Sequence, residues 1–232
     1  MIDIEGKWLT SKVANTSDIE LWLGDKDPSK AEAVCVKLYK NAIRPRVHCT
    51  TRVIPTTNKP ITQSKQQSDR PNLLLVMIDP LSKQQLRRSL PNTWALLELL
   101  GYQHFPKFVA VGNNSGPNQA ALYSGMPLDD GRQGIKTSSS NAKRRWLWDR
   151  LNDEGYVTMK AEDGCISNSN MVQSISPKTH HGQQLHEMFC QSYDRPNCLG
   201  SKLAAEHLID YTRQFINTYD RGTDKPTFMY GT

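Results

Sequence analysis

The sequence predicts an α/β fold with a mainly parallel sheet sandwiched by helices. Apolar runs of strand length alternate with helical segments along residues 70–232, and this order is typical of parallel strands joined by helical crossovers. The first run, Leu73 to Ile78, is continuously apolar, as expected for a strand that is buried on both faces. Polar residues follow several of the predicted strands, at the sheet edge where α/β proteins gather their ligand sites.

The N-terminal part has a weaker pattern. Residues 1–69 contain one candidate strand, Cys35 to Tyr39, and residues 50–69 are polar and punctuated by proline. Such composition is typical of a linker or a loosely packed flank. We therefore expect a weakly patterned N-terminal flank or linker at residues 1–69 and an α/β domain at residues 70–232.

Residues that favour helix starts and helix ends locate the elements within residues 70–232. Ser89 and Pro91 are suited to open a helix that ends at Gly101, and Gly155 is suited to end a later one, because serine caps a helix start, proline fits its first turn and glycine fits its end. The predicted elements are a strand at 73–78, a helix to 100, a strand at 107–111, a helix after Ser115, a helix at 141–154, a strand at 156–161, a helix at 202–220 and a strand at 227–231.

Composition excludes some classes of function. The chain has 232 residues, 37% of them hydrophobic, and a net charge of +6, which is enough for a core and too mild to indicate nucleic-acid binding. The longest apolar run has six residues, whereas a membrane-spanning helix needs about 20. The acidic N-terminus does not resemble an export signal. We expect no nucleic acid and no membrane span.

The five cysteines, at positions 35, 49, 165, 190 and 198, contain no CxxC pair. They prescribe neither a zinc ribbon nor a disulfide framework, and a bridge between Cys190 and Cys198 stays open. Asn15 and Asn113 each head an N-x-S triplet, which matters only in an exported chain.

Residues 111–125, VGNNSGPNQAALYSG, carry the principal candidate site. Ser115 stands just before a helix start, with a flexible Gly116 and with Pro117 in the first turn. A helix N-terminus stabilises an anion such as a phosphate or sulfate oxygen. A serine there can act as a nucleophile if a metal ion, held by Asp79 at the end of the first strand, lowers its pKa. The alternatives are an ordinary turn and cap at Ser115 and a turn hydrogen bond at Asp79.

Two further clusters are weaker candidates. Glu162 and Asp163 follow the strand at 156–161 and serve either as site carboxylates or as a cap or loop contact. His186 and Cys190 would share a helix face and could bind zinc. The alternative is that these side chains, like the other histidines, are structural or exposed.

The blocks NLLLVMIDPLS, GNNSGPNQAALYSG and GYVTMKAEDGC resemble the N-terminal half of the sulfatase-like domain family of unknown function, within the alkaline phosphatase and sulfatase superfamily. The resemblance covers roughly residue 70 to the C-terminus and includes SLPNTWALLELLG and RPNCLG. It implies an alkaline-phosphatase-like fold, with Asp79 as a metal ligand and Ser115 as catalytic nucleophile and metal ligand. The implied cofactor is a divalent ion, Ca²⁺, Zn²⁺, Mg²⁺ or Mn²⁺, and the implied partner is an anionic phosphate or sulfate ester.

The sequence departs from that family in three respects. Gln119 stands where sulfatases carry the arginine used in maturing their nucleophile, so an unmodified Ser115 and phosphoesterase-like or transferase-like chemistry are expected. Pro80 follows Asp79 where many relatives carry a hydroxyl residue, and it removes a backbone donor. The S-H-D and D-H-G motifs that complete the family's metal site are absent from the 232 residues.

Asp79 and Ser115 alone would bind a divalent ion poorly. We therefore expect a fragment, incomplete at its C-terminus, of a metal-dependent hydrolase or transferase, inactive and without tightly bound metal as this chain alone. The alternative is a non-catalytic truncated half-domain or interaction module. Family members are commonly secretory or membrane-anchored, although the sequence carries no such signal.

Overall fold

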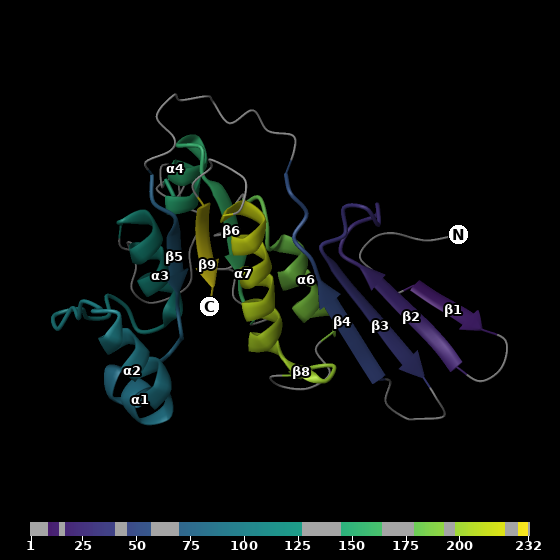
Figure 1. Ribbon diagram of the computed structural model, residues 1–232, viewed down its shortest axis with the longest axis horizontal. Helices are drawn as coiled ribbons and strands as arrows, with labels where there is room; N and C mark the ends of the chain where they lie inside the picture. The colour runs from purple at the N-terminus through teal and green to yellow at the C-terminus, as the bar shows by residue number, and fades with distance from the viewer. Residues whose placement is uncertain are drawn as a thin grey trace. The chain divides into compact units, whose positions relative to one another are not determined.

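The computed structural model describes residues 9–13, 17–39, 46–56, 70–126, 145–163, 179–192, 198–220 and 227–231 (Figure 1). The chain divides into two compact units. The first comprises residues 1–76, 148–168 and 177–232, and the second comprises residues 77–147 and 169–176. Each unit is described separately below.

The first unit contains an antiparallel sheet built from consecutive strands. Its order is β1 to β4, with bounds β1 Leu9–Val13, β2 Ser17–Leu23, β3 Ala33–Tyr39 and β4 Arg46–Thr51. Cys35 lies directly opposite Cys49, and the two form a disulfide. The sequence predicts only the strand at 35–39 because short strands with alternating polar residues lack the continuous apolar run that marks a buried strand.

The same unit contains a parallel sheet with the order β5, β9, β6. Its strands are β5 Leu73–Val76, β6 Val157–Ala161 and β9 Thr227–Gly231, and all three were expected as strands from their apolar runs. The described chain is therefore mixed α/β. The three expected strands pair in parallel, but the largest sheet of the described residues is antiparallel, and so is a small hairpin, β7 Cys198–Leu199 with β8 Lys202–Leu203. A mainly parallel, alkaline-phosphatase-like architecture is therefore not confirmed.

Strand β5 lies at one edge of the parallel sheet, and much of its apolar surface is exposed. Leu74 is 55% exposed and Val76 is 66% exposed. The prediction of a strand buried on both faces is therefore wrong for the described structure. The apolar run predicts a strand, but it does not show whether other elements cover the two faces of that strand.

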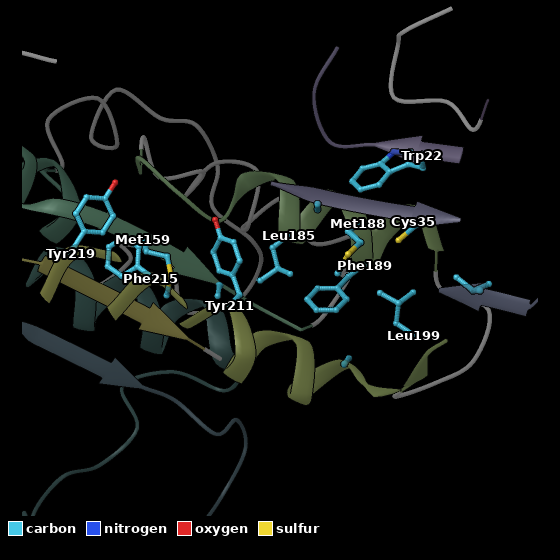
Figure 2. Close-up of a cluster of buried hydrophobic side chains, with 14 of the residues drawn as sticks. Trp22, Cys35, Met159, Leu185, Met188, Phe189, Leu199, Tyr211, Phe215 and Tyr219 are labelled. Carbon is cyan, nitrogen blue, oxygen red and sulfur yellow. The ribbon is translucent and has the colours of Figure 1, made fainter. Parts of the chain in front are cut away.

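The hydrophobic core of the first unit lies between the antiparallel sheet, strand β6 and two helices, α6 Gln183–Ser192 and α7 Ala204–Asp220 (Figure 2). On α7, buried Tyr211 and Phe215 follow the helical spacing expected from the sequence. On the sheet, Trp22 is only 1% exposed, so the N-terminal sheet contributes to this core. Residues read as a flank thus carry part of the packing.

The second unit contains the helices α1 Lys83–Ser89, α2 Pro91–Leu99 and α3 Ser115–Ser124. Helix α1 was not expected, although its Ser82 cap accepts a hydrogen bond from the Gln85 backbone N–H at 3.2 Å. The predicted strand at 107–111 is wrong, since those residues form no strand. Helix α4 spans Leu147–Asp153, and the first residues of the predicted helix at 141–154 lie outside the described ones.

Candidate functional site

Asp79 and Ser115 line a single groove of the second unit. The groove has a volume of about 1190 Å³, and its wall is formed by the segment after β5, the segment before α3, the first turn of α1 and one face of α3. Both side chains are exposed. The structure therefore brings together the two residues that the sequence singles out.

The start of α3 places the Ser115 hydroxyl. Asn114 is the N-cap, and its Oδ1 accepts a hydrogen bond from the Gly116 N–H at 3.1 Å. Ser115 is thus the first helical residue. The Asn-Ser-Gly-Pro turn forms a helix cap, as the alternative interpretation expects, and Asn114 is the capping residue. Among the described residues no hydrogen bond to Ser115 Oγ is formed, so the hydroxyl is accessible for chemistry. Because Asn114 occupies the Gly116 amide and Pro117 has no N–H, few backbone donors of this turn remain for an anion.

Asn118 holds the preceding turn against α3, a role that the sequence analysis missed. Its Oδ1 accepts hydrogen bonds from the backbone N–H groups of Val111 and Gly112, at 2.7 and 3.2 Å. Its Nδ2 donates to the carbonyls of Gly112 and Asn114, at 2.9 and 2.6 Å. Asparagine in a turn commonly bonds nearby backbone, and this preference is the only signal in the sequence that points to it.

Gly112 permits the same turn to approach the helix closely. A Cβ atom at this position would lie 2.3 Å from Pro117 Cγ and 2.5 Å from Pro117 Cβ, and the proline ring cannot rotate away. We expect Gly112→Ala to displace the turn and to lower the stability of the second unit by about 1–3 kcal/mol. Urea unfolding of the variant measures this loss. Gly101→Ala, where the surroundings are open but φ is +69°, gives the cost of backbone strain without a steric clash for comparison.

Gln119 brings a side chain of α3 next to Asp79. It lies four residues after Ser115 on α3 and therefore shares a helix face with it. Its Nε2 lies 3.5 Å from Asp79 Oδ2 and 3.6 Å from Met77 Sδ. The Asp79 carboxylate thus contacts a neutral amide that comes from the same helix as Ser115. The Asp79–Pro80 peptide bond is cis.

The groove offers a metal ion only part of a coordination shell. The Asp79 carboxylate and the Ser115 hydroxyl are oxygen donors of the kind that Mg²⁺ and Ca²⁺ prefer. Asp79 is the single ionisable side chain among the described residues that line the groove. Across the described part of the chain, no three His, Cys, Asp or Glu side chains gather as metal ligands. Of the described residues, the groove therefore offers one carboxylate and one serine hydroxyl as oxygen donors, which is fewer than a complete coordination shell needs.

Glu162 and Asp163 follow β6 in the first unit, as expected. Glu162 is 9% exposed, and its Oε2 lies 3.0 Å from Lys160 Nζ. Burial raises the pKa of Asp163, and the neighbouring negative charge of Glu162 raises it further. An ion pair with lysine favours the structural interpretation of this carboxylate pair.

The zinc alternative at α6 is wrong. Cys190 Sγ lies 3.6 Å from His186 Nε2, so the two residues share a helix face as expected. However, Cys190 is disulfide-bonded and has no thiolate to offer. Burial lowers the pKa of His186, which keeps the ring neutral. Cys198 is a free cysteine, and the bridge between Cys190 and Cys198 is therefore excluded.

A buried polar network in the first unit was not found from the sequence. Glu32 accepts hydrogen bonds from His181 Nδ1 at 2.7 Å, the Tyr211 hydroxyl at 2.8 Å and the Ile54 N–H at 3.0 Å. His181 Nε2 lies 2.7 Å from the Tyr219 hydroxyl. Burial and the Glu32 carboxylate raise the pKa of Tyr211, so its hydroxyl stays protonated and donates. The partners are distant in sequence, which is why no local pattern indicates them.

A family model with the description "Protein of unknown function (DUF229)" matches residues 25–231. The match includes β3 and β4 of the N-terminal sheet as well as both candidate residues. Neither a curated protein nor a solved structure matches the chain. Among the described residues, no helix has the length and hydropathy that a membrane span requires.

Proposed function

The chain belongs to the family described as Protein of unknown function (DUF229), and on that premise we propose that Asp79 and Ser115 are part of a metal-dependent centre. The centre hydrolyses or transfers phosphate or sulfate esters. The observation that carries this proposal is that both residues line one groove. The resemblance to the alkaline phosphatase and sulfatase superfamily supports the same assignment.

In this proposal Ser115 is the nucleophile. Its hydroxyl proton passes to solvent, and Oγ forms a bond to phosphorus or sulfur while the ester oxygen leaves with the bonding electron pair. A divalent ion beside Asp79 supplies Lewis acidity, which lowers the pKa of the hydroxyl. Water or an acceptor alcohol then takes the group from Ser115 and completes hydrolysis or transfer.

Gln119 favours phosphate over sulfate as the transferred group. Sulfatases of the resembling superfamily use a modified nucleophile and an arginine near it, whereas the side chain here is a neutral amide that contacts Asp79. An unmodified Ser115 alkoxide is suited to phosphoryl transfer. The fold proposed for the complete enzyme is alkaline-phosphatase-like, with β5, β9 and β6 as part of its central parallel sheet.

Asp79 and Ser115 need further ligands to hold a metal ion tightly. We propose that carboxylates or imidazoles from outside the described residues complete the shell, so the chain alone is expected to bind metal weakly and to turn over little substrate. Asp79→Asn should weaken even this binding, because it removes the only negative charge among the described lining residues.

Thermal unfolding with added metal tests this part of the proposal. We expect millimolar Ca²⁺, Mg²⁺ or Mn²⁺ to raise the unfolding midpoint of the chain by a few degrees, since a ligand that binds only the folded state stabilises it. The rise should be absent in Asp79→Asn and unchanged in Asp149→Asn, a carboxylate outside the groove. An equal rise in all three proteins would show that metal binds elsewhere.

A second candidate function is supported by the exposed apolar surface. Leu99, Phe105 and Phe108 of the second unit are 83%, 74% and 78% exposed, and β5 of the first unit exposes Leu74 and Val76. Soluble monomers rarely leave so much large apolar surface uncovered. We propose as the alternative a non-catalytic half-domain or interaction module that another polypeptide covers. It predicts self-association or partner binding without metal-dependent stabilisation.

Disulfides support the secretory location that the family resemblance implies. Cys35 and Cys49 are bonded to each other, and Cys190 is bonded as well. Disulfides form and persist mainly in oxidising compartments. We propose that the chain folds in the secretory pathway or an equivalent oxidising compartment, and mass spectrometry of the secreted, unreduced protein tests this.

A further inference from the structure

We infer that the groove selects esters with one anionic group and a large apolar body, such as aryl or long-chain alkyl phosphates. This inference rests on the proposed function, because it names the substrate class of the same site. It is derived from the groove wall, whereas the proposed function is derived from Asp79 and Ser115.

Apolar side chains form most of the groove wall beside the candidate nucleophile. Ile78 and Leu81 flank Asp79 in the sequence, Phe108 and Val111 come from the segment before α3, and Leu122 comes from α3 itself. Phe108 is 78% exposed and Val111 is 61% exposed. Covering such surface with an apolar ligand is favourable by about 25 cal/mol per Å², and the groove has room for a ligand of more than ten heavy atoms.

The charges of the groove match a single anionic group. Of the described residues that line it, none is Lys, Arg or His, and Asp79 is the one acid. Sites for nucleotides and sulfated carbohydrates use several arginines or lysines to pair with their several negative charges. A divalent ion on Asp79 would give a local charge of +1, which favours a ligand with one anionic group over a ligand with several separate anionic groups.

Two of the amide side chains of the groove are already engaged by the protein. Asn114 caps α3, and both ends of the Asn118 amide are bonded to the turn before it. A carbohydrate would need free donors and acceptors for its hydroxyl groups, since unpaired polar groups are costly to bury. An aromatic ring or alkyl chain needs no hydrogen-bond partners, and it can pack directly against the apolar side chains of the groove wall.

Equilibrium binding to the 232-residue chain in the presence of Ca²⁺ tests the inference with three probes: 1-naphthyl phosphate, 1-naphthol and glucose 6-phosphate. We expect naphthyl phosphate to bind at least about tenfold more tightly than glucose 6-phosphate. The double variant Phe108→Gln with Leu122→Gln should lose about tenfold in affinity for both naphthyl probes. Leu99→Gln, an exposed apolar side chain outside the groove, is the matched control and should bind as the unsubstituted chain does.

The possible results distinguish a failure of the inferred substrate class from a failure of the proposed function. Equal affinity for naphthyl phosphate and glucose 6-phosphate, or unchanged naphthyl binding in a folded double variant, would overturn the apolar selectivity. Equal affinity for naphthyl phosphate and naphthol, insensitive to Asp79→Asn, would instead overturn the anion-binding centre. Circular dichroism confirms that each variant is folded, and Val109→Gln gives a second, milder substitution in the same wall if the double variant is not.

Discussion

Replacing Glu32 with alanine is expected to lower the free energy of unfolding by about 3–5 kcal/mol. The carboxylate accepts hydrogen bonds from His181, Tyr211 and the Ile54 amide. Its removal leaves two buried side-chain donors and one half-buried backbone N–H without their acceptor. Such a loss is a large share of the 5–15 kcal/mol that stabilises a typical domain. Urea unfolding followed by tryptophan fluorescence measures it, because Trp22 is buried in the same unit.

Two variants make this prediction specific to the network. Glu32→Gln keeps an acceptor oxygen and should lose less than Glu32→Ala. Glu206→Ala removes an exposed carboxylate near the start of α7 and should change stability by about 1 kcal/mol or less. A loss below about 1 kcal/mol in Glu32→Ala would mean that water replaces the carboxylate and that the network contributes little to the stability of the unit.

Replacing Ser115 with alanine is expected to reduce turnover of an aryl phosphate by at least about 1000-fold in a protein with the complete metal shell. The variant retains the groove and Asp79 but lacks the oxygen that attacks the ester. Ser115→Thr keeps a hydroxyl at the same backbone position, and it should retain measurable turnover. Steady-state kinetics with p-nitrophenyl phosphate gives both values.

The N-x-S triplet at Asn113 requires one additional control. Ser115→Ala also destroys this triplet, so in a secretory host it would remove any glycan attached to Asn113. Ser115→Thr preserves the triplet, and Asn113→Gln removes it without touching the nucleophile. Ser89→Ala, at the end of α1 and outside the groove, controls for loss of a serine hydroxyl. Unchanged turnover in Ser115→Ala would exclude Ser115 from the reaction.

The candidate site was more predictable from the sequence than the fold around it. Asp79 follows a continuous apolar run, and Ser115 stands in a turn before a helix, so local patterns indicate both. The capping by Asn114 and the four hydrogen bonds of Asn118 depend on the detailed path of the turn. Several residue types serve at such positions, and the pattern therefore does not select among them.

The N-terminal sheet and the buried network depend on contacts between distant residues. Glu32 and His181 are separated by 149 positions, and no periodicity connects them. Strand β5 is the opposite case, since a local pattern is present but the expected burial is not. Its apolar run predicts a buried strand, but it does not indicate which element would cover it. The segment at 107–111 has the composition of a strand and forms none in the described structure, since a strand also needs a neighbour to pair with.

The central claim is that Asp79 and Ser115 hold one divalent ion between them. A crystal structure of the protein soaked with Mn²⁺, with anomalous data collected for the metal, tests it most directly. The account predicts an anomalous peak in the groove within coordination distance of the Asp79 carboxylate and the Ser115 hydroxyl. A well-occupied peak elsewhere, with these two oxygens unliganded at saturating Mn²⁺, would contradict it.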